Sequence, residues 1–257
     1  MDSKNKSDRP VSRTGDRTKK LLIIVDSDGA YLYYTGVLLQ RLEYTMHTVK
    51  TAEEALALMD IALPSLILTD AELPQMSCVD FLKQLRQNPR TQAIPVIVYA
   101  LSVEPALREA CMREGAAAFL KKPLDSDALY ATIQKVTEAT PRGYVRLTTC
   151  LPVVVGDDQA GAPESEDWIT ALSEHGAYVS TTHPNPKGAL VTLTIRLENV
   201  SVRLAGKVLY SFDRTTSPLR IPGMGVQFLQ LRSEDQNIIK AFIERQLTKD
   251  LSRPGGG

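Results

Sequence analysis

Two aspartates and a lysine stand at the ends of short apolar runs. Asp26 follows the run Leu21–Val25, Asp70 follows Ser65–Thr69, and Lys122 follows a later run. Continuous apolar runs are typical of strands buried on both faces. Ligands of an open parallel sheet collect outside the carboxyl ends of its strands, so we expect the three side chains to converge there. Carboxylates hold Mg²⁺, a lysine pairs with phosphate, and an aspartate can attack a phosphoryl donor.

Two arginines form a second constellation. Arg142 and Arg146 follow a break at Thr140-Pro141 and precede a predicted strand, which places both in a linker. Guanidinium groups bind phosphate through two hydrogen bonds and also stack on planar bases. The pair could therefore hold a dianionic ligand, and the alternative interpretation is a solvated pair of surface charges.

The first half of the chain alternates strand and helix patterns. Thr51 and Glu54 form a capping box, and Ser102 is a candidate cap for the helix that ends near Gly115. The alternation predicts a doubly wound parallel sheet with right-handed crossovers. The predicted strands are Leu21–Val25, Ser65–Thr69, Pro95–Tyr99 and Ala117–Leu120, and the predicted helices carry Val37–Leu42, Leu56–Met59, Val79–Leu85, Leu107–Cys111 and Leu129–Val136.

The pattern changes after Pro141. Apolar and polar residues alternate over Val191–Glu198 and Val200–Leu204, which predicts antiparallel strands. Glu198-Asn199 and Ala205-Gly206 are predicted turns. A loop over Gly156–Asp167 and a closing helix, opened by a capping box at Ser233 and Gln236, complete this half.

Composition narrows the classes of protein. The 257 residues favour two domains, and 30 basic residues balance 30 acidic ones. The zero net charge argues against a general nucleic-acid binder. No apolar run is long enough for a membrane span or a secretory signal, and three cysteines without a CxxC pair fit a reducing cytoplasm. We predict that residues 1–20 and 251–257 are disordered.

The first half resembles the response-regulator receiver family. The matching segments are Ile24–Asp26, Leu68–Met76, Ile94–Ile97, Gly115-Ala116 and Lys121–Leu124, within a domain of residues 21–138. The resemblance implies that Asp70 is the phosphoacceptor and that Lys122 contacts the phosphate. It also implies a Mg²⁺ site made by Asp26, Asp70 and the backbone carbonyl of Glu72, and a histidine kinase as partner.

Two positions depart from the receiver pattern. Ser27 stands where the family has a second acidic residue, and Asp28 fits a helix N-cap better than a metal ligand. Ala100 stands at the switch position, which is normally Thr or Ser. Fewer carboxylates should weaken Mg²⁺ binding. A pseudo-receiver, kept for its fold and docking face, is therefore the alternative to a phosphorylated one.

The second half resembles the PilZ domain, a small β-barrel whose members often bind cyclic di-GMP. The arginine pair is followed by Ser173 and Gly176 in Ala171–Ala177, and later by Gly223–Phe228. The resemblance implies a linker over residues 139–146 and a barrel over 147–250, with Arg142, Arg146, Ser173 and Gly176 on the ligand. Ala171 replaces the family's Asp or Asn, and His175 and Trp168 are candidates for compensating contacts.

Together these features predict a two-component signalling adaptor, cytoplasmic and not an enzyme, since no catalytic motif is present. The receiver would be coupled to a cyclic di-GMP-sensing barrel that controls a motility, attachment or exopolysaccharide protein. The alternative is a ligand-free scaffold that acts through protein–protein contacts. A transcription factor is disfavoured because no helix-turn-helix segment is seen, and homodimer formation is left open.

Overall fold

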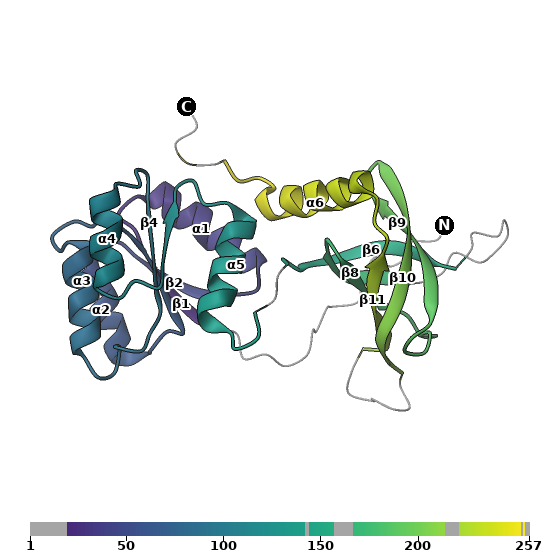
Figure 1. Ribbon diagram of the computed structural model, residues 1–257, viewed down its shortest axis with the longest axis horizontal. Helices are drawn as coiled ribbons and strands as arrows, with labels where there is room; N and C mark the ends of the chain where they lie inside the picture. The colour runs from purple at the N-terminus through teal and green to yellow at the C-terminus, as the bar shows by residue number, and fades with distance from the viewer. Residues whose placement is uncertain (1–19, 142–143, 157–166, 214–220, 253, 255–257) are drawn as a thin grey trace, which may run out of the picture. The chain divides into compact units, whose positions relative to one another are not determined.

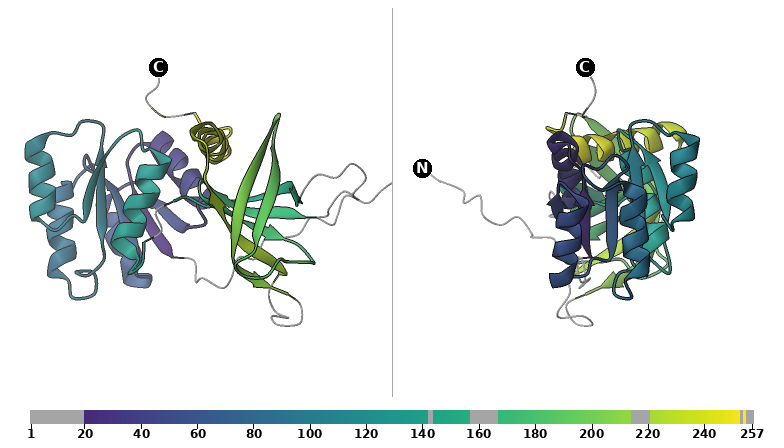
Figure 2. Two further views of the ribbon diagram at one scale, coloured as in Figure 1. Left: turned by 45° about the vertical axis from the view of Figure 1, so that its right-hand side comes forward. Right: turned by 90° about the vertical axis from the view of Figure 1, so that its left-hand side faces the viewer.

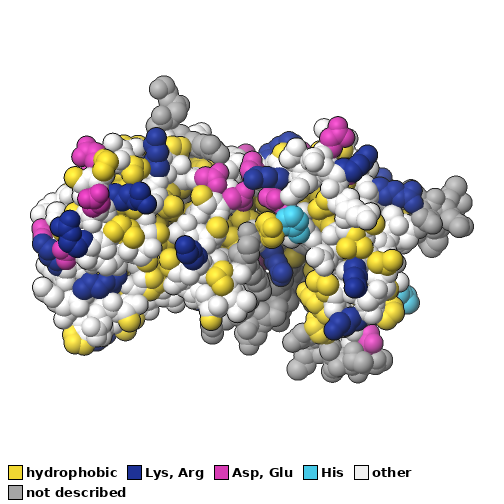
Figure 3. All heavy atoms as spheres, in the orientation of Figure 1, with side chains coloured by type: hydrophobic (Ala, Val, Ile, Leu, Met, Phe, Trp, Pro, Cys, Tyr) yellow, Lys and Arg dark blue, Asp and Glu magenta, His cyan; other side chains and the backbone are white. Residues whose placement is uncertain are grey.

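A computed structural model describes residues 20–141, 144–156, 167–213, 221–252 and 254. The chain divides into two compact units, which are described separately. The first unit comprises the described residues up to Val145 and those from Leu247 onward. The second unit comprises the described residues of Arg146–Gln246. Residues 157–166 of the predicted loop Gly156–Asp167, and the N-terminal arm through residue 19, lie outside the described residues. Acidic and basic side chains are intermixed on the visible face, in keeping with their equal numbers (Figure 3).

The first unit is a parallel sheet with helices on both faces, as predicted. The strand order is β2-β1-β3-β4-β5, with α2, α3 and α4 on one face and α1 and α5 on the other (Figures 1 and 2). β1, β3 and β4 are almost completely buried, which explains their continuous apolar sequences. The elements are β1 Leu21–Val25, α1 Gly29–Arg41, β2 Thr45–Val49, α2 Ala52–Ile61, β3 Leu66–Asp70, α3 Cys78–Gln87, β4 Val96–Ala100, α4 Pro105–Arg113, β5 Ala118–Lys121 and α5 Ser126–Thr137.

Side-chain caps set the starts of several of these helices. Asp28 accepts a hydrogen bond from the backbone N–H of Ala30, and Thr51 accepts one from that of Glu54, as the sequence predicted. The predicted cap at Ser102 is wrong. α4 begins at Pro105 after Glu104, which makes no side-chain cap bond, because proline at the first helical position needs no N–H partner.

β2 is a strand that the sequence patterns missed. Thr45–Val49 pairs in parallel with β1 at the edge of the sheet, with Leu21 opposite Thr45. Its residues are exposed or only partly buried, so it lacks the continuous apolar run of the central strands. A short edge strand of this kind carries little local signal.

The second unit is a closed antiparallel barrel with a C-terminal helix, also as predicted. The strands follow one another around the barrel in the order β10-β11-β8-β7-β6-β9, and β9 pairs with β10 to close it. Inward-facing side chains such as Ile169, Val179 and Ile195 are fully buried. The elements are β6 Leu147–Val155, β7 Trp168–Ser173, β8 Gly176–Ser180, β9 Leu190–Leu197, β10 Val200–Phe212, β11 Gly223–Leu229 and α6 Ser233–Thr248.

The predicted turn at Glu198-Asn199 is present, but the one at Ala205-Gly206 is not. β10 runs without a break through Gly206, where a Cβ atom would collide with the side chain of Val226 on β11. This glycine therefore allows two strands to approach rather than the chain to turn. The capping box predicted for α6 is also absent, since the helix starts at Ser233 itself and the Gln236 amide contacts Glu174 at 3.5 Å.

Candidate functional site

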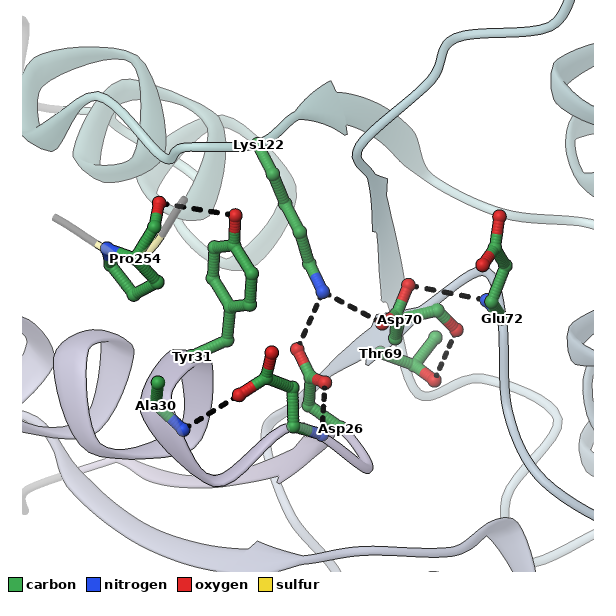
Figure 4. A network of polar contacts seen from close by, with 9 residues as sticks. Asp26, Ala30, Tyr31, Thr69, Asp70, Glu72, Lys122 and Pro254 are labelled. Atoms are coloured by element: carbon green, nitrogen blue, oxygen red, sulfur yellow. Dashed lines mark hydrogen bonds and ion pairs between the residues drawn. The ribbon is translucent and has the colours of Figure 1, made fainter. Parts of the chain in front are cut away.

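The receiver-like unit gathers three charged side chains at one edge of its sheet. Lys122 Nζ lies 2.8 Å from Asp26 Oδ2 and 2.7 Å from Asp70 Oδ2 (Figure 4). Asp26 directly follows β1, Asp70 is the last residue of β3, and Lys122 directly follows β5. We call Asp26, Asp70 and Lys122 the acidic cluster, and the sequence predicted that these three would meet.

The acidic cluster is buried and has one more negative than positive formal charge. Lys122 is 3% exposed, Asp70 is 8% exposed and Asp26 is fully buried. Burial raises the pKa of Asp26, because removing a carboxylate from water costs more than its hydrogen bond and ion pair with Lys122 recover. The ammonium therefore serves as the common counterion of two desolvated carboxylates.

Two tyrosines enclose the ammonium, and the sequence patterns did not indicate them. Lys122 Nζ lies 4.1 Å from the ring centre of Tyr31 and 4.8 Å from that of Tyr99, both within cation–π range. The hydroxyl of Tyr31 donates a hydrogen bond to the Pro254 carbonyl at 3.3 Å (Figure 4). Burial raises the pKa of both tyrosines, so both rings are neutral at physiological pH.

The two departures from the receiver pattern have visible consequences. Ser27 is exposed, and Asp28 uses its carboxylate to cap α1. Ala100 is buried in the hydrophobic core and carries no hydroxyl. The described residues contain no group of three His, Cys, Asp or Glu side chains able to hold a metal.

Mg²⁺ would have two charged ligands here. The carboxylates of Asp26 and Asp70 face the same point, and the third ligand would be the backbone carbonyl of Glu72, whose N–H donates to Asp70 Oδ1 at 3.2 Å. These donors are the oxygen ligands that Mg²⁺ prefers. The ammonium of Lys122 competes with the cation for both carboxylates, so these residues would bind Mg²⁺ weakly.

The barrel unit brings one of the two arginines beside the predicted ligand turn. Leu147 pairs with Leu172 and Thr148 with Ala171, so Arg146 is one residue beyond the last pair and opposite Ser173. Leu147 and Leu172 point into the core, which leaves Arg146 and Ser173 on the outer face of the wall. Arg146 is exposed, and Arg142 lies outside the described residues.

The turn between β7 and β8 is held by its own hydrogen bond. Ser173 Oγ donates to the carbonyl of Gly176 at 3.0 Å across the two-residue turn that contains His175. A Cβ atom at Gly176 would lie 2.5 Å from the Val226 carbonyl oxygen, so only glycine lets β8 approach β11 here. His175 is partly exposed, and its carbonyl accepts the N–H of Phe228 at 2.9 Å.

Ala171 lies on the same outer face, between two neighbours that the sequence patterns did not identify. It pairs with Thr148 on β6 and with Tyr178 on β8. Tyr178 stands two residues after Gly176, so period-two alternation alone places both on one face. We call Arg146, Ala171, Ser173 and Gly176 the barrel face.

Two family models match the chain. Residues 22–134 match the response regulator receiver domain, and residues 140–245 match the PilZ domain. These matches coincide with the parallel-sheet unit and the barrel unit.

Individual relatives resemble parts of the chain. The response regulator Rre1 of Synechocystis is 26% identical over 180 residues, 70% of this chain and 74% of its own. Protein PilH of Pseudomonas aeruginosa is 26% identical over 115 residues, 45% of this chain and 95% of its own. Among solved structures, the chemotaxis response regulator CheY4 of Vibrio cholerae is 25% identical with a TM-score of 0.44, covering 46% of this chain and 99% of that one. Within the described residues, no helix has the length and apolar character needed to cross a bilayer.

Proposed function

The chain carries a response regulator receiver domain followed by a PilZ domain, and we propose from this that it is a signalling adaptor in which cyclic di-GMP binds the barrel and controls a partner protein. The ligand would lie on the barrel face. Its phosphates would contact Arg146 and Arg142, and its sugar–phosphate edge would approach Ser173 and Gly176. Neither domain is given a catalytic step, and we place the protein in the cytoplasm.

The observation that carries this proposal is the register of β6 with β7. Continued by one residue, this register would bring the exposed Arg146 opposite Ser173, next to the tight turn that ends at Gly176. A guanidinium on an open surface, beside a backbone without side-chain cover, suits a planar dianionic ligand that must approach closely. Ala171 supplies no polar group to the base, so the arginines would provide most of the binding.

For the receiver domain we propose docking of a histidine kinase as the principal role, with Asp70 as the phosphoacceptor when it is modified. In phosphoryl transfer a carboxylate oxygen of Asp70 would attack the phosphoryl donor, and Lys122, which pairs with Asp70 and lies against the Tyr31 ring, would contact the phosphoryl oxygens. Mg²⁺ bound by Asp26, Asp70 and the Glu72 carbonyl would neutralise the phosphoryl oxygens. Ala100 offers no hydroxyl to a phosphoryl group, so the usual hydroxyl switch would not operate.

Coupling between the domains would come through the segment that carries the two arginines. If both hold one ligand, they restrict the backbone between residues 142 and 146 and favour one arrangement of the domains. Small-angle scattering during a titration with cyclic di-GMP tests this step. An unchanged profile at saturating ligand would reject it while leaving binding itself intact.

Isothermal calorimetry with cyclic di-GMP tests the function. We expect saturable binding to the full chain, and a loss of about tenfold to a hundredfold for Arg146→Ala and for Arg142→Ala, because each removes a charge-assisted contact. Arg196→Ala is the matched control, since Arg196 is an exposed arginine on β9 outside the barrel face. The absence of binding heat at millimolar ligand would refute the proposal.

The second candidate function is a ligand-free scaffold. Three substitutions favour it, since Ser27, Ala100 and Ala171 each remove a group that the two families use. This function predicts that the chain binds a protein partner but does not bind cyclic di-GMP. The same calorimetry therefore separates the two functions, and a negative result would support the scaffold.

A further inference from the structure

A row of aromatic side chains extends from the barrel face on β8, over β11, to β10. Tyr178 on β8, Tyr210 on β10 and Phe212 on β10 all lie on the outer wall, and we call them the aromatic strip. The ring centres of Tyr178 and Tyr210 are 6.4 Å apart with an interplanar angle of 29°, and those of Tyr210 and Phe212 are 5.5 Å apart. Tyr210 is 40% exposed, so the strip keeps a solvent-facing surface.

Two glycines of β11 form the floor of this strip. Gly225 pairs with both Tyr210 and Tyr178, and Gly223 pairs with Phe212. A Cβ atom at Gly225 would collide with the Tyr210 ring, and one at Gly223 would lie 3.0 Å from Cε1 and Cζ of Tyr178. Both glycines are buried although they are on the outer side of the strand, which shows that the rings cover them. The rings therefore lie against the backbone and turn their other faces outward.

A hydrogen bond to the backbone holds the ring of Tyr178 in place. The hydroxyl of Tyr178 donates a hydrogen bond to the Ile221 carbonyl at 2.8 Å, which holds the ring against Gly223 and Gly225 of β11. Tyrosine has few rotatable bonds, so an ordered ring offers contact area at a small cost in entropy. Such a surface suits a flat aromatic ligand.

The strip begins where the barrel face lacks a polar group. Tyr178 is directly opposite Ala171 and two residues from Gly176, about 7 Å along the strand. We propose that Tyr178 and Tyr210 form a stacking surface for one guanine base of cyclic di-GMP. This inference rests on the proposed function, and it names the residues that would replace the missing Asp or Asn contact. Stacking would supply affinity without reading the polar edge of the base, because every base has an aromatic face.

The test compares Tyr210→Leu with Tyr210→Phe in the full chain, by calorimetry with cyclic di-GMP. Leucine keeps an apolar side chain over Gly225 but lacks the aromatic face, and phenylalanine keeps the ring. We expect Tyr210→Leu to bind about 5-fold to 150-fold more weakly than wild type and Tyr210→Phe to bind nearly as well. Tyr33→Leu, an exposed tyrosine on α1, is the control and should leave affinity unchanged. The emission of Trp168, the sole tryptophan, reports whether the barrel remains folded.

The outcomes separate this inference from the function on which it rests. If wild type binds, Arg146→Ala weakens binding and Tyr210→Leu does not, the stacking surface is refuted and the proposed function stands. Equal losses for the leucine and phenylalanine variants would also refute it, because the ring would then not be the binding element. If wild type shows no binding, both proposals fail, and the aromatic strip becomes a candidate protein-docking surface.

Discussion

Replacing Lys122 with methionine tests whether the acidic cluster depends on a single counterion. The ammonium makes both ion pairs of the cluster, at 2.8 and 2.7 Å, in a setting where Lys122 and Asp26 are almost completely shielded from water. Methionine is of similar length and has no charge, so it leaves two neighbouring carboxylates without a partner. Breaking a buried ion pair from one side costs about 3–5 kcal/mol, because the remaining charge stays desolvated.

That loss is a large fraction of the total stability of a domain, which is about 5–15 kcal/mol. For a unit of this size it lowers the melting temperature by roughly 10–25 °C. Lys121→Met is the matched control. Lys121 is the adjacent residue and is exposed, so its substitution should change the free energy of unfolding by no more than about 0.5 kcal/mol.

The two domains can be followed separately in the full chain. Among the described residues, five of the six helices belong to the receiver domain, so circular dichroism at the helix band follows mainly that unit. The sole tryptophan, Trp168, is on β7 and follows the barrel. We expect Lys122→Met to lower the midpoint temperature of unfolding followed by circular dichroism. The midpoint followed by tryptophan fluorescence should not change.

The pH dependence gives a second check. The loss of stability in Lys122→Met should shrink as the pH falls, because protonation removes the unpaired carboxylate charges. Since the pKa of Asp26 is raised, this protonation begins above the usual carboxyl pKa of 3.8. A variant within 1 kcal/mol of wild type at neutral pH, or a deficit independent of pH, would refute the role of Lys122 as the shared counterion.

Three further predictions concern single side chains. Asp26→Asn should stabilise the receiver domain at pH 7 and lose this advantage towards pH 4. The pKa of Asp26 is raised in the folded state, so the contribution of Asp26 to stability is present below about pH 3.8 and is lost as the pH rises through the folded-state pKa. Thermal unfolding at several pH values measures the difference in stability between the variant and wild type. Ala171→Asn should strengthen cyclic di-GMP binding several-fold to about a hundredfold by restoring a hydrogen bond to the base, and calorimetry showing no gain would contradict the assignment of this position. Asp70→Asn should abolish labelling by radioactive acetyl phosphate in the presence of Mg²⁺. Asp80 is an exposed aspartate on α3, so the control Asp80→Asn should still be labelled. Label retained by Asp70→Asn would exclude Asp70 as the phosphoacceptor.

The sequence by itself determined the architecture and the position of the acidic cluster. Buried strands have continuous apolar runs and half-exposed strands alternate, so the change of pattern after Pro141 separated the two folds. Asp26, Asp70 and Lys122 could be placed together because the carboxyl ends of parallel strands share one edge. Helix caps such as Asp28 and Thr51 were also predicted, since their hydrogen bonds span only a few residues.

Beyond the acidic cluster, tertiary structure decided which distant side chains meet. Tyr31 covers Lys122, and Tyr210 lies over Gly225, because sheet pairing and helix packing join segments far apart in the chain. Gly206 was mistaken for a turn, since close approach to Val226 leaves no trace among its sequence neighbours. The edge strand β2 escaped for a related reason: its pairing with β1 comes from backbone hydrogen bonds, which carry no residue pattern.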